Sequence, residues 1–263
     1  MVVGLGEIGL PIFKIISQAT PTEGHDIKKK YDKKQYHKFP KYETSILHVC
    51  IPFTNKFERN ILNTVSKFQP SGIVIHSTIR PGTTEKLQKK LKIPVIYSAT
   101  RGMHRQMIKD LRRYTKFFAI YNWAPKHRWA QRKFANIMRN SGIKIKKMSN
   151  PLTLELAKIV CDTSYYGWLI NYAQISNMIA IQNKIDYDEM WSFADEIHKF
   201  LGNRPKMFPG FIGGHCVVQN LKLIDKEDLR QIDKINNLYA KKVKNAKSIA
   251  KKYVKGRQSS DTV

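Results

Sequence analysis

The first half of the chain alternates short apolar runs with segments whose apolar residues recur at helical spacing. The runs are rich in valine, isoleucine and aromatic residues, as strands are. Strands that alternate with helical segments are typical of a parallel sheet whose crossover connections are helices. The predicted strands are residues 1–3, 45–51, 72–76, 95–98, 117–121 and 143–146, and the predicted helices are residues 10–17, 56–67 and 83–91.

Beyond residue 148 the pattern becomes largely helical. Residues 152–182 carry apolar side chains too densely for one amphipathic stripe, which predicts a long helix buried on most of its sides. Asp186, with Glu189 three residues later, is typical of a helix N-terminus and predicts a helix that runs through Phe200. The remaining segments are a loop rich in Gly and Pro, residues 203–214, and a third helical pattern, residues 226–253.

Composition excludes several classes of protein. The chain has 263 residues, of which 42% are apolar and 11% aromatic, so it can form a substantial core. No apolar run approaches the ~20 residues of a membrane-spanning helix, and no basic segment leads into a long apolar stretch at the start. The three cysteines, Cys50, Cys161 and Cys216, include no CxxC pair, which argues against a disulfide framework or a zinc site. We therefore expect a cytoplasmic protein that binds neither membrane nor metal.

Charge is the unusual feature of the composition. Lys and Arg total 47 against 20 Asp and Glu, which gives a net charge of +27. Such an excess favours anionic partners, among them nucleotides and nucleic acids. A lysine-rich composition without a dedicated binding surface explains the same count. We interpret the basic residues between positions 234 and 257 as a solvated helix face, in preference to a nucleic-acid contact.

A glycine motif, GLGEIG, begins at Gly4, directly after the first predicted strand and before the first predicted helix. In this context GxGxxG is the fingerprint of a dinucleotide-binding loop. Gly4 permits the tight turn, Gly6 lets backbone N–H groups approach a pyrophosphate, and Gly9 allows the helix to pack closely on the strand. Glu7 and Ile8 complete the candidate loop, and the N-terminus of the helix supplies partial positive charge for the phosphates.

An acidic residue is expected ~20 residues after such a loop, where it binds the ribose hydroxyls of the adenosine. Asp26 follows Gly4 by 22 residues and meets this expectation, with Asp32 as a weaker candidate. The strand expected before Asp26, residues 20–23, is poor in apolar side chains. A carboxylate at this position repels a 2′-phosphate, so the predicted cofactor is NAD and not NADP.

These patterns predict an α/β fold, with a Rossmann-type parallel-sheet domain followed by an all-helical domain built on a long central helix. We place the NAD-binding domain at residues 1–148, the helical dimerisation and catalytic domain at residues 149–255, and a disordered tail at residues 256–263. The apolar surface of residues 152–182 exceeds what one small helical domain covers, which predicts a homodimer built on this helix.

The sequence PGFIGGHC, residues 209–216, places three glycines just before Cys216. Such a backbone allows something to approach closely, and it presents a thiol at the end of a turn. A thiolate adds readily to an aldehyde, and nearby cations lower the pKa of a thiol. Cys216 is therefore the candidate nucleophile. Cys50 and Cys161 lack this context and are predicted to be core residues.

Four segments in this order resemble the family of UDP-glucose, GDP-mannose and UDP-N-acetylmannosamine dehydrogenases. The resemblance implies an NAD-binding domain, a helical domain that dimerises through its long helix, and oxidation of a sugar alcohol to a carboxylate in two NAD-dependent steps. The segments are GLGEIGLP (residues 4–11), HSTIRPGTT (76–84), ELAK (155–158) and PGFIGGHC (209–216).

The resemblance also implies roles for individual residues. Cys216 would capture the aldehyde as a thiohemiacetal, which a second oxidation converts into a thioester that water hydrolyses. Lys158 would hold the developing oxyanion, a task suited to a compact ammonium donor. Thr78 would lie near the nicotinamide and the catalytic water.

The chain departs from the family at three points. Asp162 and Asn220 stand where the family has asparagine and aspartate, so that an acid and an amide are exchanged and both positions remain candidates for the site. Thr100 stands where the family has the glutamate that activates water, and a neutral hydroxyl is a poor general base near pH 7. The chain also ends before the family's C-terminal nucleotide-binding domain, which leaves the handle for a full nucleotide sugar unaccounted for.

The residues support three functional hypotheses. The first is an NAD-dependent oxidoreductase that acts on a sugar-type alcohol through Cys216. The second is a β-hydroxyacid-dehydrogenase-like enzyme that uses Lys158 without covalent catalysis. The third is a non-catalytic descendant whose basic surface binds a polyanion or a protein complex.

Overall fold

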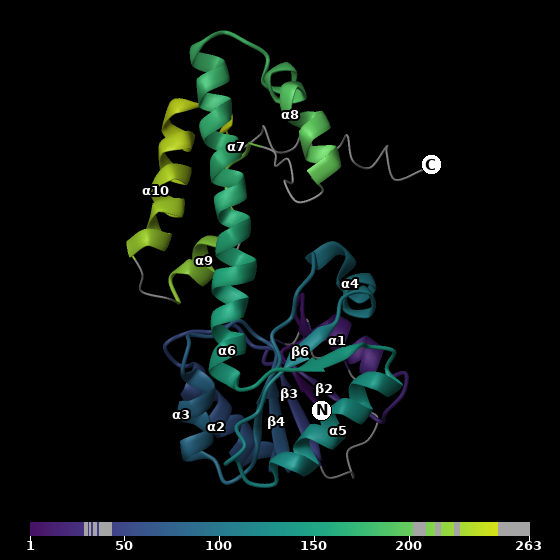
Figure 1. The fold of residues 1–263 in the computed structure, drawn as a ribbon. Helices are drawn as coiled ribbons and strands as arrows, with labels where there is room; N and C mark the ends of the chain where they lie inside the picture. Colours follow the sequence, from purple (N-terminus) through teal and green to yellow (C-terminus); the bar gives the residue numbers. More distant parts are fainter. Residues whose placement is uncertain are drawn as a thin grey trace. The chain divides into compact units, whose positions relative to one another are not determined.

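A computed structural model of the chain describes residues 1–28, 31, 33, 36, 44–201, 209–213, 217–223 and 227–246 (Figure 1). These residues form two compact units, which divide between Lys158 and Ile159. Cys216, Asp32, the tail at 256–263 and the end of the third predicted helix lie outside the described residues.

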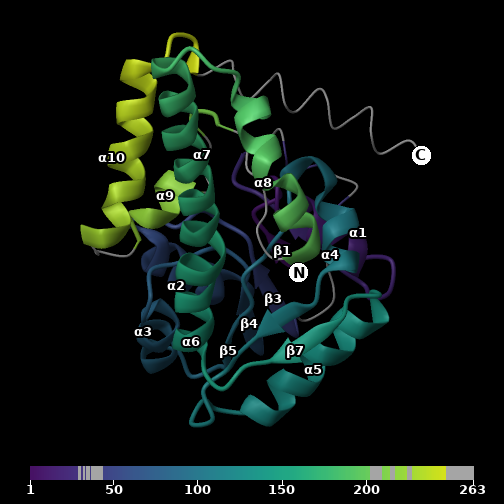
Figure 2. The ribbon, with the colours of Figure 1, turned by 45° about the horizontal axis from the view of Figure 1, so that its top comes forward.

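The first unit is built on a five-stranded parallel sheet with the order β2-β1-β3-β4-β5. β2 pairs with one side of β1, and β3, the next strand along the chain, pairs with the other side. The carboxyl ends of β1 and β3 therefore form the switch point of a doubly wound sheet. Figure 2 shows β1, β3, β4 and β5 side by side. The strands are β1 (Val2–Val3), β2 (Gly24–His25), β3 (Ile46–Val49), β4 (Gly72–Ile75) and β5 (Val95–Tyr97).

Two further strands extend this arrangement. β6 (Lys116–Phe118) is followed by an antiparallel bridge between Ala119 and Tyr97, and it pairs in parallel with β7 (Ile145–Lys147). Because β6 runs against β5, the start of β6 lies at the carboxyl end of the parallel strands.

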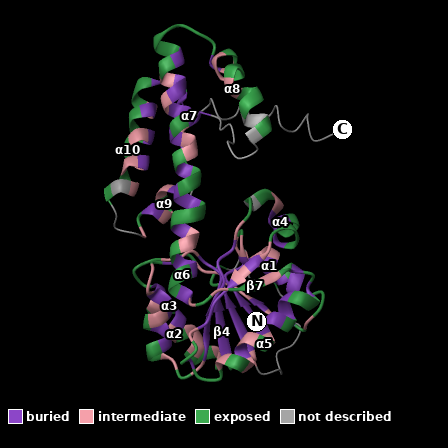
Figure 3. Cartoon of the chain, viewed as in Figure 1, coloured by how far each residue is buried: buried purple, intermediate pink, exposed green. Residues whose placement is uncertain are grey.

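Helices cover both faces of the sheet, and each face has its own hydrophobic core. The strands β3 and β4 are buried along their full length, as Figure 3 shows, which explains why they read as nearly continuous apolar runs. On one face lie α1 (Gly9–Ile16), α4 (Met107–Arg113) and α5 (His127–Asn140), and on the other α2 (Phe57–Phe68), α3 (Thr83–Lys90) and α6 (Pro151–Leu156). The predicted α/β fold is confirmed.

The element bounds differ from the predictions mainly at one place. The strand expected at residues 20–23 is instead the two-residue β2 at Gly24–His25. Residues 20–23 are largely polar, so the strand is set by its pairing with β1 and not by an apolar run. The helices predicted at residues 10–17, 56–67 and 83–91 begin and end within about two residues of α1, α2 and α3, which is the usual uncertainty of helix ends, whereas α4 and α5 were not predicted.

The second unit contains the helical half of the chain. Residues 151–182 are helical throughout, as predicted, but a π-helical segment (Ala157–Ser164) lies between α6 and α7 (Tyr165–Gln182). The predicted cap is also confirmed, because the backbone N–H of Glu189 donates to Oδ1 of Asp186 at 2.8 Å. The remaining helices are α8 (Tyr187–Leu201), α9 (Val217–Leu221) and α10 (Glu227–Lys242).

The polarity of α7 is the reverse of an ordinary amphipathic helix. Its buried side carries amides, and its exposed side carries large apolar residues, so the prediction that it is buried on most sides is wrong for the single chain. Asn177 illustrates the buried side, where its Oδ1 accepts from the hydroxyl of Tyr239 at 3.0 Å. The exposed aromatic residues are Tyr165, Tyr166, Trp168 and Tyr172.

Candidate functional site

The glycine loop follows β1 and leads into α1. Gly4 has a φ of +87°, and a Cβ added there would lie 2.8 Å from the carbonyl oxygen of Cys50. A Cβ on Gly9 would lie 1.7 Å from the carbonyl oxygen of Gly4. These two glycines are therefore required by the loop itself, in agreement with their predicted roles.

Gly6 is different from its two neighbours in the motif. A Cβ added to Gly6 would meet nothing within 4 Å, and its φ is not in the left-handed region. The described residues therefore impose no steric need for glycine at this position. Glu7 is exposed and Ile8 half-buried, and the first turn of α1, all of it described, has no acidic residue to compensate the helix dipole.

Asp26 lies against the same loop. β2 pairs in parallel with β1, and the N–H of Gly4 donates to the carbonyl of His25 at 2.9 Å, so the residue after β2 lies beside the glycine turn. Oδ2 of Asp26 accepts the backbone N–H of Leu5 at 2.6 Å, and Oδ1 accepts that of Lys28 at 2.8 Å. The structure thus brings the predicted ribose-binding acid and the glycine motif together.

Thr78 follows β4 at the same carboxyl edge of the sheet and is half-buried. The residues before it are fixed by hydrogen bonds to neighbouring strands. The hydroxyl of Ser77 donates to the carbonyl of Ile51 at 2.5 Å, and the N–H of His76 donates to that of Val49 at 2.9 Å. These hydrogen bonds fix the two residues that precede Thr78.

A row of buried titratable side chains lies behind this edge. Alternation along the strands directs His48, His76, Ser98 and Lys116 to one face of the sheet, the face covered by α1, α4 and α5. Nδ1 of His48 lies 2.9 Å from Nε2 of His76, and Nδ1 of His76 lies 3.2 Å from the carbonyl of Ser98. Burial holds the pKa of both histidines well below its usual value, so both rings are neutral. A neutral His76 that donates to Ser98 must accept from His48.

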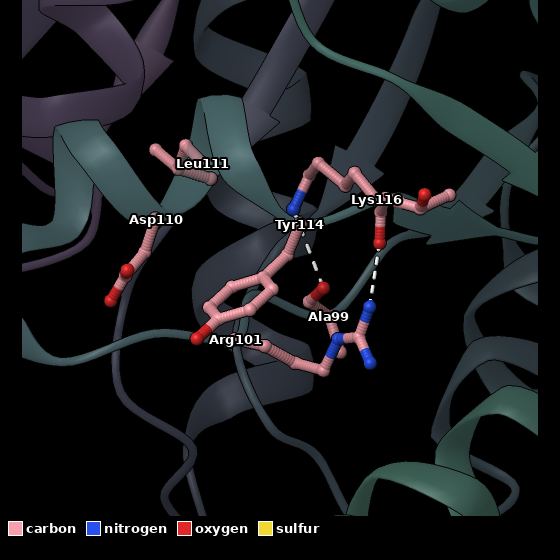
Figure 4. Close-up of a pocket in the computed structure, with 7 residues that line it drawn as sticks. Ala99, Arg101, Asp110, Leu111, Tyr114 and Lys116 are labelled. Atoms are coloured by element: carbon pink, nitrogen blue, oxygen red, sulfur yellow. Dashed lines mark hydrogen bonds between the residues drawn. The ribbon is translucent and has the colours of Figure 1, made fainter.

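Lys116 ends this row. Its side chain is buried, and Nζ donates to the carbonyl of Ser98 at 3.1 Å, the carbonyl of Ala99 at 3.4 Å and Oγ1 of Thr100 at 3.0 Å. Burial is the main cause that lowers the pKa of the amine to about 7, with smaller contributions from the positive charges of Arg101 and Lys158 against the opposing effect of Cys50. Figure 4 shows the amine directed at Ala99, beside Arg101, whose Nη2 donates to the carbonyl of Thr115.

The pocket drawn in Figure 4 is small. Lys116, Arg101 and Asp110 are its charged lining residues, and its volume is about 10 Å³. That volume is at the lower limit for one water molecule, so the pocket does not hold a substrate.

Glu155, part of the ELAK segment, forms hydrogen bonds with the residues at the start of α3. Its buried carboxylate accepts from the N–H of Gly82 at 2.6 Å and from both the N–H and the hydroxyl of Thr84, at 3.0 and 2.6 Å. These groups open α3, so Glu155 caps that helix and holds α6 against it. Burial raises the pKa of this carboxyl, and the hydrogen bonds from Thr84 oppose the shift.

The predicted residues of the second half are less completely described. Lys158 is half-buried and Asp162 exposed, four residues apart in the π-helical segment. Asn220 is half-buried on α9. Cys216 lies outside the described residues.

The described part of the cysteine loop is held by buried amides. The side chain of Asn236 accepts the N–H of Ile212 at 2.8 Å and donates to its carbonyl at 3.2 Å. Nε2 of Gln174 donates to the carbonyl of Gly210 at 2.7 Å and to Oδ1 of Asn236 at 3.1 Å. α7 and α10 therefore fix the segment that leads to Cys216.

Of the other two cysteines, Cys161 differs from the prediction, whereas Cys50 packs against the hydrophobic core. Cys161 is exposed on the π-helical segment, so its assignment to the core is wrong. Cys50 is half-buried beside the glycine loop, and desolvation raises the pKa of its thiol to about 12. Its thiol stays protonated at neutral pH and is not a nucleophile.

The described residues contain no group of three or more His, Cys, Asp or Glu placed to hold a metal ion. None of the described helices combines the length and apolar character needed to cross a bilayer.

Sequence reasoning missed Lys116, His48 and the capping role of Glu155. The signal for the first two was a titratable residue inside or beside an apolar strand run, SILHVCI and KFFAIY. Such a residue is buried, and a buried polar group requires hydrogen-bond partners.

No family model matches the chain, and no curated protein matches it. Solved structures do. A UDP-D-ManNAc dehydrogenase from Pyrococcus horikoshii superposes with a TM-score of 0.74 at 20% identity, over 91% of this chain and 69% of that one. The UDP-N-acetyl-mannosamine dehydrogenase of Staphylococcus aureus gives 0.68 at 18% identity, over 90% and 67%.

A 3-hydroxyisobutyrate dehydrogenase from Mycobacterium tuberculosis gives a TM-score of 0.67 at 13% identity, over 94% of both chains. At these identities the likeness establishes the fold. This chain spans about two thirds of the length of the two nucleotide-sugar dehydrogenases and nearly all of the third protein.

Proposed function

We propose that this chain is an NAD-dependent oxidoreductase that oxidises a sugar-type alcohol. The observation that carries the proposal is Gly6, whose Cβ position is open although the fold does not need glycine there, in a loop to which Asp26 is hydrogen-bonded. An accessible backbone before a helix N-terminus, with a carboxylate at its side, suits a pyrophosphate with an adjoining ribose.

The residues of the first unit fit NAD. The N–H groups of the loop and the start of α1 would bind the pyrophosphate, and the carboxylate of Asp26 would accept the ribose hydroxyls. Bound NAD⁺ supplies the acceptor for a hydride. Asp26 favours NAD over NADP because its negative charge opposes a 2′-phosphate. Thr78, at the end of β4, would lie on the nicotinamide side of the site.

The proposed chemistry uses five side chains. The thiol of Cys216 adds to the aldehyde formed in the first oxidation, the second oxidation gives a thioester, and water cleaves it to the acid and the free thiol. Lys158 stabilises the oxyanion of the additions. Asp162 and Asn220 provide an acid and an amide beside them, and Thr78 positions the water.

A sugar substrate is supported by two observations. The four sequence segments occur in the order of the nucleotide-sugar dehydrogenases, and two such enzymes share the fold over about nine tenths of this chain. The amides that hold residues 209–213 add a physical reason for a precisely placed thiol, since Asn236 fixes both backbone groups of Ile212.

A second enzyme class is supported by the 3-hydroxyisobutyrate dehydrogenase, of which this chain covers 94%. An enzyme of that kind would use Lys158 and no thiol. Turnover of UDP-sugars with NAD⁺, followed by NADH absorbance in the wild type and in Cys216→Ser, separates the two. Loss of acid formation in the variant supports covalent catalysis, and full activity contradicts it.

The exposed aromatic side of α7 supports a homodimer. Tyr165, Tyr166 and Tyr172 are each at least half exposed in the single chain, which is unusual for large aromatic residues on one helix. A second copy packed against this side would cover them. Sedimentation at micromolar concentration should give the mass of a dimer, and a monomer would contradict this part of the proposal.

Binding of nucleic acid through the basic surface remains a third candidate function. The only acid among residues 101–154, Asp110, is buried, whereas α4, α5 and β7 expose many cations. Binding to RNA or DNA that weakens steeply with salt would favour this function. Each phosphate of a duplex that the protein neutralises adds ~0.9 to the slope of log binding constant against log salt concentration. The exposed basic residues of α4, α5 and β7 are Lys109, Arg112, Arg113, Arg128, Arg132, Arg139, Lys146 and Lys147.

A further inference from the structure

We infer that Lys116 accepts the proton released when the alcohol is oxidised, and that the hydroxyl of Thr100 relays this proton to it. The inference rests on the proposed function and adds a base that the sequence segments do not contain. Neither residue belongs to the set proposed above for the additions and the hydrolysis.

Thr100 lies at the edge of the sheet where the proposed site is. Thr100 follows β5 at the carboxyl edge of the sheet, and its backbone N–H donates to the carbonyl of His76 at 3.1 Å, two residues before Thr78. Its side chain is nearly buried, and the amine of Lys116 lies behind it at 3.0 Å. The hydroxyl therefore contacts the buried amine at the carboxyl edge of the sheet, where the backbone of Thr100 is joined to the segment that leads to Thr78.

The contacts around the amine of Lys116 suit both its charged and its neutral form. An ammonium has three donors, and Nζ has three acceptors around it, the carbonyls of Ser98 and Ala99 and Oγ1 of Thr100. A neutral amine keeps two donors for the carbonyls and offers its lone pair to the hydroxyl proton of Thr100. The amine can take up or release a proton without any side chain moving.

The charged and titratable groups around the amine of Lys116 set its protonation state. The groups that face Lys116 are Cys50 after β3, Arg101 after β5 and Lys158 on the π-helical segment, with His48 and His76 on β3 and after β4 and Asp110 across the small pocket. Both histidines and the Cys50 thiol are neutral near pH 7. Burial and the two cations bring the pKa of the amine to about 7, so both protonation states are populated there.

The substrate O–H bond breaks and its proton passes, through one water molecule, to Oγ1 of Thr100, while the hydroxyl proton of Thr100 passes to Nζ of Lys116. Bound NAD⁺ would accept the electron pair of the C–H bond as hydride, and the carbonyl bond of the aldehyde would form. Lys116 later returns the proton to solvent by the reverse path.

Calorimetric titration with NAD⁺ and with NADH tests this inference. Titrations at pH 7 in two buffers that differ in ionisation enthalpy measure the protons released on binding. The oxidised nicotinamide carries a positive charge and should expel a proton from Lys116, whereas NADH should not. We expect release with NAD⁺ in the wild type and its loss in Lys116→Arg, which stays charged.

The outcomes are distinguishable. Binding of NAD⁺ with no proton release, or with equal release in Lys116→Arg, overturns the inference and leaves the proposed function intact. An absence of binding removes the proposed function and the inference with it.

A second measurement, an NMR titration, uses the wild type and variants of Thr100, so it does not depend on whether a Lys116 variant folds. In the wild type, NMR of labelled lysine should show one amine that titrates near pH 7. Its midpoint should fall in Thr100→Val, which removes an acceptor of the charged form, and should return in Thr100→Ser. A wild-type chain in which all lysines titrate above pH 9, or a midpoint insensitive to Thr100→Val, overturns the inference.

Discussion

The carboxylate of Asp26 accepts the backbone N–H of Leu5 at 2.6 Å, which joins the end of β2 to the glycine loop that follows β1. These residues are 21 positions apart in the sequence, and the parallel pairing of β1 with β2 brings them together. The contact fixes the acid at the side of the loop where a ribose would lie, and it makes cofactor preference a property of one side chain.

Asp26→Asn should therefore narrow the preference for NAD⁺ over NADP⁺. The amide oxygen can still accept the N–H of Leu5, although the NH2 group cannot accept that of Lys28, and the negative charge that opposes a 2′-phosphate is gone. We expect the ratio of the two dissociation constants to change by about tenfold, or ~1.4 kcal/mol. Equilibrium titrations with both cofactors measure the ratio, and an unchanged ratio would show that Asp26 does not face the ribose.

The three glycines of the motif should separate into two classes. Gly9→Ala places a Cβ 1.7 Å from the carbonyl oxygen of Gly4, so we expect a loss of ~3 kcal/mol or more and a clear fall in Tm. Gly6→Ala meets nothing within 4 Å and should change stability by no more than ~0.5 kcal/mol. Thermal unfolding of the two variants checks the contrast, and equal effects would contradict it.

Asn236→Ala should destabilise the helical unit and loosen the segment before Cys216. The substitution leaves the buried N–H and carbonyl of Ile212 without their partner, at a cost of ~1–3 kcal/mol for each unsatisfied group. Its neighbour Asn237 is exposed, and Asn237→Ala is the matched control, with an expected effect near zero. Urea denaturation followed by circular dichroism compares the pair, and similar midpoints would refute the assigned role of Asn236.

Lys116 should make stability depend on pH between 7 and 8.5. Its pKa is lowered to about 7 in the folded chain, from 10.5, so in this window the unfolded chain binds more protons. Stability therefore rises with pH, by up to ~1.4 kcal/mol per pH unit from this group. The amino group of Met1 adds a rise of the same sign up to about pH 8, because burial lowers its pKa from 8.0 to about 6. Cys50 opposes the rise near the upper end of the window, because burial raises the pKa of its thiol from 9.0 to about 12. Lys116→Met should therefore reduce the slope without abolishing it, and a slope equal to that of the wild type would contradict the assignment.

The sequence allowed the sheet and its loop to be predicted for identifiable reasons. β3 and β4 are buried on both faces, so their apolar runs are unmistakable, and the motif at Gly4 depends on local turn geometry. Asp26 follows from a fixed distance along the chain, although its strand does not, because β2 has only two residues and is held by its pairing with β1.

Other features depend on tertiary pairing that no local pattern contains. Lys116 joins the row of His48 and His76 only because β6 runs antiparallel to β5, which brings its first residue to the carboxyl edge. The reversed polarity of α7 arises from buried amides such as Gln174, which hydrogen-bond to the cysteine loop and to Asn236. A pattern of dense apolar residues does not show which side of a helix the amides occupy.

The central claim is that the loop at Gly4 binds the pyrophosphate of NAD, and calorimetric titration of the folded chain with NAD⁺ tests it most directly. The variant Gly6→Val serves as the comparison, because its side chain enters open space and would obstruct only a ligand. We predict saturable binding in the wild type that is lost in Gly6→Val at an unchanged Tm. Absence of binding in the wild type, or equal binding in both proteins, would contradict the account.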